Sequence, residues 1–135
     1  MTEVLVDTRA HRLTLCDRGE ARESFRVRLG RNGTHKRREG DQRTPVGTYT
    51  LSPPRSSSRF HMFIPIDYPT PKQRHEGFTG SAVGIHATSR AFAWLGAITA
   101  YVDTTDGCIA VAHDREIESI ATWVRTQQQP RIRIE

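Results

Sequence analysis

Two side chains in this sequence could act together as a nucleophile and a base: the thiol of Cys108 and the imidazole of His86. Cys108 lies in the run Thr105-Asp106-Gly107-Cys108-Ile109, where the glycine allows a tight turn that brings backbone N–H groups close to a reacting carbonyl. A thiol becomes a useful nucleophile when a neighbouring base favours the thiolate. His86 follows the apolar run 83–85 and is expected where a strand ends and loops gather. Taken alone, the run around Cys108 favours a buried structural cysteine over a catalytic one.

A third conspicuous segment is the stretch 30–47, which lacks hydrophobic periodicity and is dense in charged residues, glycine and proline. It contains the run Arg38-Glu39-Gly40-Asp41-Gln42-Arg43 and then Thr44-Pro45-Val46-Gly47-Thr48-Tyr49. Loops of this length inside a compact domain are usually functional. The segment is therefore predicted to be a long functional loop.

In this order, the three segments resemble the L,D-transpeptidase (YkuD-like) family of cell-wall cysteine enzymes. That family carries a Thr-Pro-x-Gly-x-Tyr/Phe turn, a strand ending in His-Gly or similar, and then Ser/Thr-x-Gly-Cys-Ile/Val, which correspond to residues 44–49, 85–88 and 105–109. The match is closest to the YafK-like murein branch. The resemblance implies a mainly β fold, a closed β-barrel or sandwich with one C-terminal helix and short helical loop segments. It also implies a single catalytic domain over residues 1–135.

The resemblance further implies how a reaction would proceed. Cys108 would attack the carbonyl between the diamino acid of a peptidoglycan stem peptide and its D-amino-acid neighbour, forming a thioester. His86 would take the thiol proton and later activate an acceptor amine or water, with a backbone carbonyl near Ala87 orienting the ring. Thr105 would support the loop, and the amides of the turn would form the oxyanion hole: Asp106, Gly107 and Cys108. No cofactor and no metal are implied.

One departure from the family pattern concerns substrate binding. Many members carry an arginine two residues after the cysteine, whereas this chain has Ala110. The arginines expected to replace it are Arg43, Arg59 and Arg90, and the full set of expected substrate-binding residues is Arg43, Thr44, Arg59, Arg90 and Ala87. Asp41, Thr44 and Gly47 are as compatible with shaping the wall of the cleft as with contacting substrate.

Hydrophobic alternation predicts the strands that must position these residues. An antiparallel meander is expected over the first 30 residues, followed by strands at 48–51, 60–67, 82–85 and 131–134, with Pro65 indicating an edge strand. Asp114 is expected to cap a helix that runs to about Thr126 and buries one face: Ile117, Ile120, Ala121 and Val124. Residues 68–80 are predicted to be a loop or short helix, and a further short helix is expected within 89–107.

Composition limits the other classes of function. The chain has 135 residues, which suits one domain, and a net charge of +5, which would attract polyanions in general. No zinc-finger spacing or ribonucleoprotein-type signature accompanies the charge, so nucleic acid is not an expected partner. The six histidines show no metal-ligand spacing, and Cys16 is expected to be a small buried residue.

The sequence was also searched for a membrane-spanning segment and a signal peptide. No apolar run approaches the roughly 20 residues that span a bilayer. No signal peptide is visible at the N-terminus, so a wall enzyme would need a signal that has been removed or an unconventional route of export. The periplasm or cell wall is expected from function, and a cytoplasmic location stays open.

The sequence thus predicts a cysteine-dependent enzyme of L,D-transpeptidation that acts as a monomer on peptidoglycan stem peptides. A hydrolytic variant is the first alternative: an L,D-carboxypeptidase, or a hydrolase that opens cross-links or releases a wall-attached lipoprotein, including one exported as an effector. A non-catalytic wall-binding module is a further alternative, against which the presence of both Cys108 and His86 argues.

Overall fold

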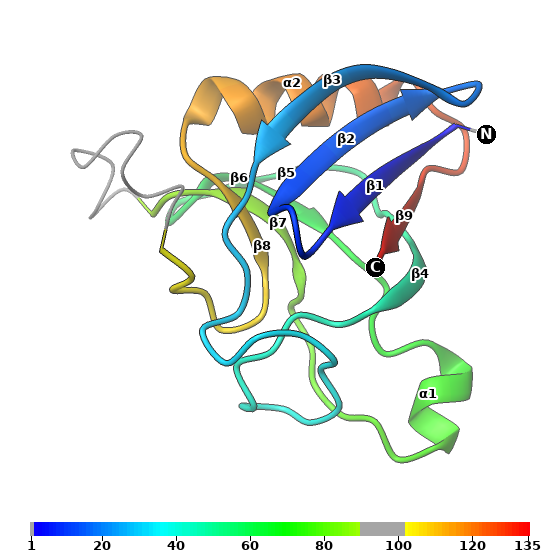
Figure 1. Cartoon of the computed structure of the whole chain (residues 1–135), viewed down its shortest axis with the longest axis vertical. Helices are drawn as coiled ribbons and strands as arrows, with labels where there is room; N and C mark the ends of the chain where they lie inside the picture. The colour runs from blue at the N-terminus through cyan, green and yellow to red at the C-terminus, as the bar shows by residue number, and fades with distance from the viewer. Residues whose placement is uncertain (1, 90–101) are drawn as a thin grey trace.

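The structure is a computed structural model that describes residues 2–89 and 102–135. Strands make up most of its regular structure, with one short and one longer helix in the described ranges (Figure 1). In chain order the elements are β1 (Glu3–Asp7), β2 (Arg12–Asp17), β3 (Glu20–Arg26), β4 (Gly47–Thr50), β5 (Arg55–Ser57), β6 (His61–Pro65), α1 (Pro71–His75), β7 (Gly84–Ala87), β8 (Ile109–Val111), α2 (Asp114–Arg125) and β9 (Arg131–Ile134).

The first sheet has the strand order β3-β2-β1-β9-β4. β1, β2 and β3 form the expected antiparallel meander, β9 joins β1 in parallel, and β4 pairs with β9 in an antiparallel manner. Because side chains alternate along a strand, one face of this sheet is apolar and enters the core. Its side chains are at most 2% exposed: Val4, Val6, Leu13, Leu15, Ile132 and Ile134.

The second sheet has the order β5-β6-β7-β8, and α2 packs against β6, β7 and β8. The apolar face predicted for α2 is confirmed, since Ile117, Ile120, Ala121 and Val124 are buried. The helix begins one residue earlier than the sequence suggested: His113, and not Asp114, is the N-cap, and its N–H donates to the Glu116 carboxylate at 3.0 Å. Glu116 is then the reciprocal half of a capping arrangement at the start of the helix.

The expected closed barrel is wrong, because the described strands form two separate sheets. Between the sheets, the described backbone makes single bridges, at Arg28 with Ala110 and at Leu51 with Ile66, and no continuous ladder. A barrel needs strands that stay paired along their length all the way round. Of the two expected architectures, the sandwich of two sheets is therefore the one observed.

Two further strand predictions are corrected. β6 is an interior strand that lies between β5 and β7, and not an edge strand. Pro65, which has no backbone N–H to donate, is tolerated because it is the last residue of β6. β5 lies where the sequence suggested only a break, since Arg55, Ser56 and Ser57 show no apolar alternation. Residues 30–46 form no strand or helix of their own, as expected for the loop, and Gly47 is already the first residue of β4. α1 is the short helix expected within 68–80.

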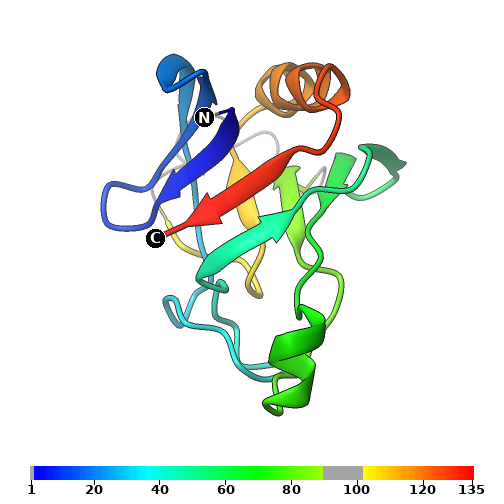
Figure 2. The ribbon, with the colours of Figure 1, turned by 90° about the vertical axis from the view of Figure 1, so that its right-hand side faces the viewer.

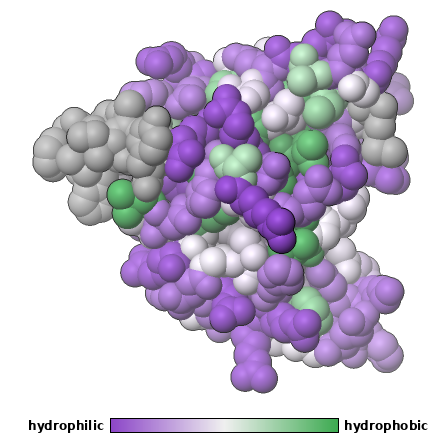
Figure 3. Space-filling model, in the orientation of Figure 1, coloured by the Kyte–Doolittle hydropathy of each residue, from purple (hydrophilic) through white to green (hydrophobic). Residues whose placement is uncertain are grey.

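The two helices mark opposite ends of the molecule. In Figures 1 and 2, α2 covers one end, while α1 and the loop 30–47 lie together at the other. The face seen in Figure 3 is mostly hydrophilic, and hydrophobic residues appear on it only as small separate patches. In the described ranges, no helix is long and apolar enough to cross a membrane.

Candidate active site

Strand pairing brings His86 and Cys108 to the same part of the fold. β7 and β8 run in parallel, with Ile85 opposite Ile109 and His86 opposite Ala110, and Cys108 directly precedes β8. Because of the alternation along each strand, Ile85 and Ile109 point into the core, where both are 0% exposed. His86 and Cys108 instead line one common cavity.

This cavity has a volume of about 1050 Å³. Residues 55–60, from β5 and the turn that follows it, form part of its wall, and the turn 104–106 forms another part. The cavity is large enough for a peptide of a few residues, at the upper end of the range usual for small-molecule sites. The described lining contains a single acidic side chain, that of Asp106. It contains four arginines: Arg28, Arg31, Arg55 and Arg59.

The imidazole of His86 is held by its neighbours on two sides. Its Nδ1 lies 2.6 Å from the backbone oxygen of Ala87, which can only accept, so Nδ1 carries the proton and Nε2 has the free lone pair. The ring of Phe60 stacks on the imidazole with centroids 3.8 Å apart and planes inclined by 20°. These contacts fix both the tautomer and the orientation of the ring.

The electrostatic surroundings keep His86 neutral. Burial lowers its pKa to about 4, and the nearby charges of Arg28 and Arg59 act in the same direction, against an opposing effect of the bond to Ala87. An imidazole in this state is a base at neutral pH and not an imidazolium. His86 is 4% exposed, so bulk water has little access to it.

Cys108 is half-buried, and its thiol donates to the backbone oxygen of Ala82 at 3.5 Å. Burial raises the pKa of the Cys108 thiol, and the charge of Asp106 adds to that effect, whereas a backbone contact at Gly84 and the charges of Lys36 and Arg59 oppose it. The resting pair is therefore a neutral thiol and a neutral imidazole, not a thiolate–imidazolium pair. Transfer of the thiol proton must accompany any attack by sulfur.

The turn before the nucleophile is fixed by one hydroxyl. Thr105 Oγ1 donates to the backbone oxygen of Cys108 at 2.7 Å and accepts from the N–H of Gly107 at 3.1 Å. Gly107 has φ +130°, and a Cβ added there would lie 2.6 Å from the backbone oxygen of Arg43. The residue must therefore be glycine, and its N–H is already used by Thr105.

This arrangement narrows the expected oxyanion hole. With the N–H of Gly107 bonded to Thr105, the amides of Asp106 and Cys108 are the turn amides for which the described residues provide no acceptor. The side chain of Asp106 is turned toward Arg31, whose guanidinium lies 3.2 Å from its carboxylate. We keep Asp106 and Cys108 as the candidate donors to a developing negative charge.

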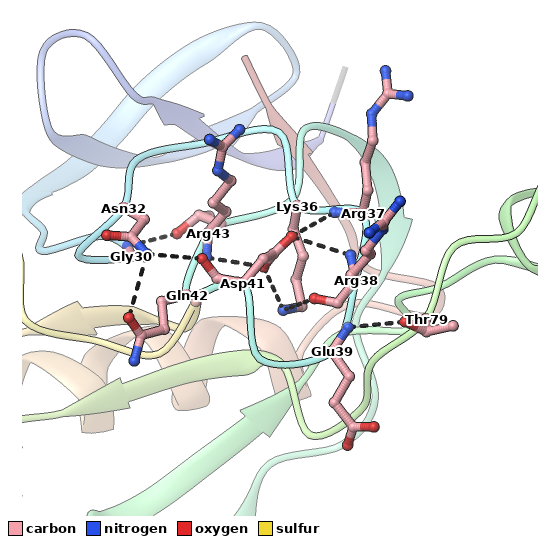
Figure 4. Close-up of polar contacts among 12 residues, drawn as sticks. Gly30, Asn32, Lys36, Arg37, Arg38, Glu39, Asp41, Gln42, Arg43 and Thr79 are labelled. Carbon is pink, nitrogen blue, oxygen red and sulfur yellow. Dashed lines mark hydrogen bonds and ion pairs between the residues drawn. The ribbon is translucent and has the colours of Figure 1, made fainter.

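The loop 30–47 is organised around the carboxylate of Asp41 (Figure 4). That carboxylate accepts from the Lys36 ammonium at 3.0 Å and from the backbone N–H groups of Arg37, Arg38 and Arg43 at 2.9 to 3.1 Å. Burial raises the pKa of Asp41, but these hydrogen bonds outweigh it and bring the pKa down to about 2. We name this cluster, Lys36 with residues 37–43, the Asp41 knot.

The Asp41 knot supports the nucleophile turn from behind. The Arg43 backbone oxygen packs against Gly107, and the Lys36 side chain would lie 3.8 Å from a Cβ at that glycine. Thr44 is 0% exposed, and its hydroxyl accepts from the N–H of Gly30 at 2.9 Å. Thr44 is thus a part of the wall, and its complete burial is at odds with the expected contact between its side chain and substrate.

The remaining expected substrate residues fall in different places. Arg59 lines the cavity and lies over the Phe60 ring at 4.8 Å. Arg43 lines a separate hollow with residues of the Asp41 knot, and not the cavity that holds Cys108. Ala87 is 0% exposed, so only its backbone contributes, through His86. Arg90 lies outside the described residues.

Two residues important to the cavity were not found from the sequence. Phe60 was expected to lie on an apolar strand face, within the run 58–61 that resembles the YafK-like branch, and nothing in this pattern indicates a stack on His86. Arg28 follows β3 and is 5% exposed, and it reaches the cavity through a bridge to Ala110 that is remote in the sequence. Among the described residues, no group of three His, Cys, Asp or Glu side chains could hold a metal ion.

Comparison with solved structures shows the same fold. Pgp2, the helical cell shape determining protein of Campylobacter jejuni, has a TM-score of 0.79 at 23% identity, over 99% of this chain and 47% of that one. Bd1075 of Bdellovibrio bacteriovorus gives 0.71 at 22% identity, over 99% and 47%. The L,D-transpeptidase LdtMt1, solved in complex with imipenem, gives 0.61 at 15% identity, over 99% and 58%. This chain thus spans about half the length of the structures it matches.

The fold and a cavity that holds both a cysteine and a histidine define a domain of the L,D-transpeptidase type. The family model for the L,D-transpeptidase catalytic domain (YkuD) matches residues 1–133. The chain therefore belongs to that family, and the resemblance seen in the sequence is confirmed. No curated protein matches the chain in sequence.

Proposed function

We propose that this chain is a cysteine acyltransferase of peptidoglycan stem peptides, acting at the bond between the diamino acid and the following D-amino acid. The observation that carries the proposal is the placing of Cys108 and His86 on one cavity by the parallel register of β7 and β8. The membership in the YkuD family supplies the substrate class. The neutral state of both groups supports catalysis by proton transfer.

In the first half of the reaction, the Cys108 thiol turns from the Ala82 carbonyl toward His86. Sulfur attacks the carbonyl carbon of the diamino acid while Nε2 of His86 takes the thiol proton. The developing negative charge on oxygen lies toward the amides of Asp106 and Cys108. The C–N bond then breaks, the imidazolium returns its proton to the leaving amine, and the D-amino acid departs from a thioester at Cys108.

In the second half, an acceptor attacks the thioester carbonyl. His86 takes a proton from the acceptor, the C–S bond breaks, and the thiolate of Cys108 recovers a proton from the imidazolium. An amine as acceptor gives transpeptidation, whereas water gives carboxypeptidase or cross-link hydrolase activity. Release of a wall-attached lipoprotein would follow the same steps with a different donor.

Stem peptides incubated with the protein test this proposal, with the products identified by mass spectrometry. The wild type should release the terminal D-amino acid, and Cys108→Ala should release none above the uncatalysed background. Cys16→Ala is the matched control, because Cys16 is the other free, half-buried cysteine and lies in β2, outside the cavity. Equal products from the wild type and Cys108→Ala would refute the enzyme and leave the wall-binding module.

The choice between transfer and hydrolysis needs a second measurement on the same reaction. A competing D-amino acid or amine at rising concentration should be incorporated into the product if the acceptor is an amine. Incorporation of ¹⁸O from labelled water into the new carboxylate would identify hydrolysis instead. The two outcomes are distinguished in one mass spectrum.

The nucleophile has a separate chemical test. LdtMt1 was solved in complex with imipenem, and we expect the same compound to acylate Cys108 once per chain. Intact-mass spectrometry should show one adduct on the wild type and on Cys16→Ala, and none on Cys108→Ala. We further propose that the protein acts as a monomer in the periplasm or at the cell wall, which sedimentation and cell fractionation can check.

A further inference from the structure

Three side chains lie in a row across neighbouring strands next to the nucleophile. Ala110 of β8 is paired with His86 of β7 on one side and with Arg28 on the other. The bridge to Arg28 is closed by two backbone hydrogen bonds, Arg28 N–H to Ala110 oxygen at 2.8 Å and Ala110 N–H to Arg28 oxygen at 3.0 Å. Residues paired in this way carry their side chains on the same face of a sheet.

The alanine in the middle determines what its neighbours can do. Its side chain is a single methyl group and is 0% exposed, whereas the longer His86 and Arg28 extend past it and both line the cavity. The backbone of Arg28 lies one strand away from Ala110, about 5 Å. Arg28 therefore brings a guanidinium to the cavity from the strand position next to the one where many family members carry an arginine.

Arg28 is a buried cation beside the reacting pair. It is 5% exposed, and its Nη1 donates to the Thr88 hydroxyl at 2.8 Å. Its charge acts on His86, where it lowers the imidazole pKa, and the charge of Asp103 acts on it in turn. A guanidinium is a planar cation whose N–H groups match the geometry of a carboxylate, so an arginine that lines the cavity is suited to bind one.

The rest of the described lining favours an anionic ligand as well. Arg31 is engaged with Asp106, while Arg55 and Arg59 lie over the rings of Phe63 and Phe60. A cavity with an excess of cations and low-dielectric walls attracts groups of opposite charge. Among these cations Arg28 is the most buried and has a fixed backbone position beside the active pair.

We propose that Arg28 is a specificity-determining residue that binds a carboxylate of the acyl-donor peptide next to the bond that is cleaved. The inference rests on the proposed function and names the feature by which that site selects its substrate. Two carboxylates of a stem peptide have this chemistry, the C-terminal one of the leaving D-amino acid and the one on the side chain of the diamino acid. A peptide in which the selected carboxylate is an amide should be a poor substrate.

The test compares three stem peptides: one with both carboxylates free, one with a C-terminal carboxamide, and one with a side-chain carboxamide on the diamino acid. For the wild type we expect kcat/KM to fall at least tenfold on amidation of the selected carboxylate. The ratio of kcat/KM for the free peptide to kcat/KM for that carboxamide should lie within about twofold of one in Arg28→Gln. Arg131→Gln, an exposed arginine of β9 outside the cavity, should keep the wild-type ratio.

A ratio that stays at the wild-type value in Arg28→Gln would overturn the proposal, as would a wild type that accepts all three peptides equally. Arg28→Lys guards against a variant that fails to fold: it keeps the charge but loses the bidentate geometry, and its ratio should fall between the other two. Loss of rate on all three peptides by one common factor would assign Arg28 a structural role and refute the proposal.

A binding measurement separates this proposal from the proposed function. Calorimetry on Cys108→Ala, which cannot form a thioester, should show at least tenfold tighter binding of the free peptide than of the selected carboxamide. The preference should disappear in Cys108→Ala/Arg28→Gln. If no peptide is cleaved but this preference is present and depends on Arg28, the proposed catalysis fails and the carboxylate site stands. If the preference survives removal of Arg28, the carboxylate site fails.

Discussion

Lys36 in the Asp41 knot and Arg28 beside the cavity are equally buried, each 5% exposed, yet their surroundings differ. Lys36 donates to the Asp41 carboxylate and to the backbone oxygen of Arg38, both at 3.0 Å, and is not among the residues that line the cavity. Arg28 donates to the Thr88 hydroxyl, feels the charge of Asp103, and lines the cavity. Equal burial therefore accompanies two different settings, one inside a hydrogen-bonded loop and one at the wall of a cavity.

The two regions meet at Gly107, which the Arg43 oxygen contacts from behind while Cys108 follows it into the cavity. The comparison predicts a division of effects. Changes on the cavity side should alter turnover more than stability, changes in the Asp41 knot should alter stability more than turnover, and changes at Gly107 should alter both.

The largest effect is expected at His86. His86→Ala removes the base, so kcat/KM for release of the D-amino acid should fall about 10³-fold. His61→Ala is the matched control, because His61 pairs with Glu118 outside the cavity and should change the rate little. More than a tenth of wild-type activity in His86→Ala would mean that another group is the base.

Gly107→Ala should damage both regions, with a loss of about 3 kcal/mol in the free energy of unfolding from backbone strain and overpacking together. Gly33→Ala is the control, because Gly33 also has a positive φ, +93°, but nothing within 4 Å of an added Cβ. It should cost about 1 kcal/mol. Urea unfolding measures both, and equal losses would show that the contact with Arg43 is unimportant.

Acid should destabilise the cavity side at a higher pH than the Asp41 knot. The pKa of His86 is about 4 in the folded chain and 6.5 when unperturbed, so the unfolded chain binds the proton first as pH falls. The stability that this group contributes is present above pH 6.5 and is lost between 6.5 and 4, by about 3 kcal/mol. In His86→Ala, unfolding free energies measured over this range should show a correspondingly weaker dependence on pH.

Asp41 should affect the free energy of unfolding over a lower range of pH. Its pKa is about 2 when folded against 3.8 unperturbed, so its contribution is present above pH 3.8 and is lost as pH falls to 2. Asp41→Asn should cost about 2 kcal/mol at pH 7 and almost nothing at pH 2. Glu39→Gln, an exposed neighbour, is the control. A cost that is independent of pH would mean that the carboxylate charge does not hold the loop.

The sequence predicted those parts of the fold whose signals are local. Alternation of apolar residues gave β1, β2 and β9, and the spacing of Ile117, Ile120, Ala121 and Val124 gave the buried face of α2. β5 was missed because Arg55, Ser56 and Ser57 become a strand only by pairing with β6. The barrel was wrong because closure depends on pairings between remote strands, which no local pattern encodes.

The same limit applies to the site. Cys108, His86 and the long loop carry recognisable motifs, so the sequence could single them out, and their catalytic roles stay predictions. Arg28 was not among the arginines expected at the site, since its place in the cavity depends on a bridge to Ala110 across the fold. The full burial of Thr44 could not be read from its neighbours either, because it results from packing against Gly30.

The contact between Gly107 and the Arg43 backbone has a consequence for how this family can vary. Surface loops are normally where insertions accumulate, because a change in length there disturbs little else. The loop 30–47 is an exception: a single extra residue between Asp41 and Thr44 would shift the Arg43 oxygen and with it the nucleophile turn. Related chains should conserve the length of this loop, and place their insertions at exposed turns such as the one between β2 and β3.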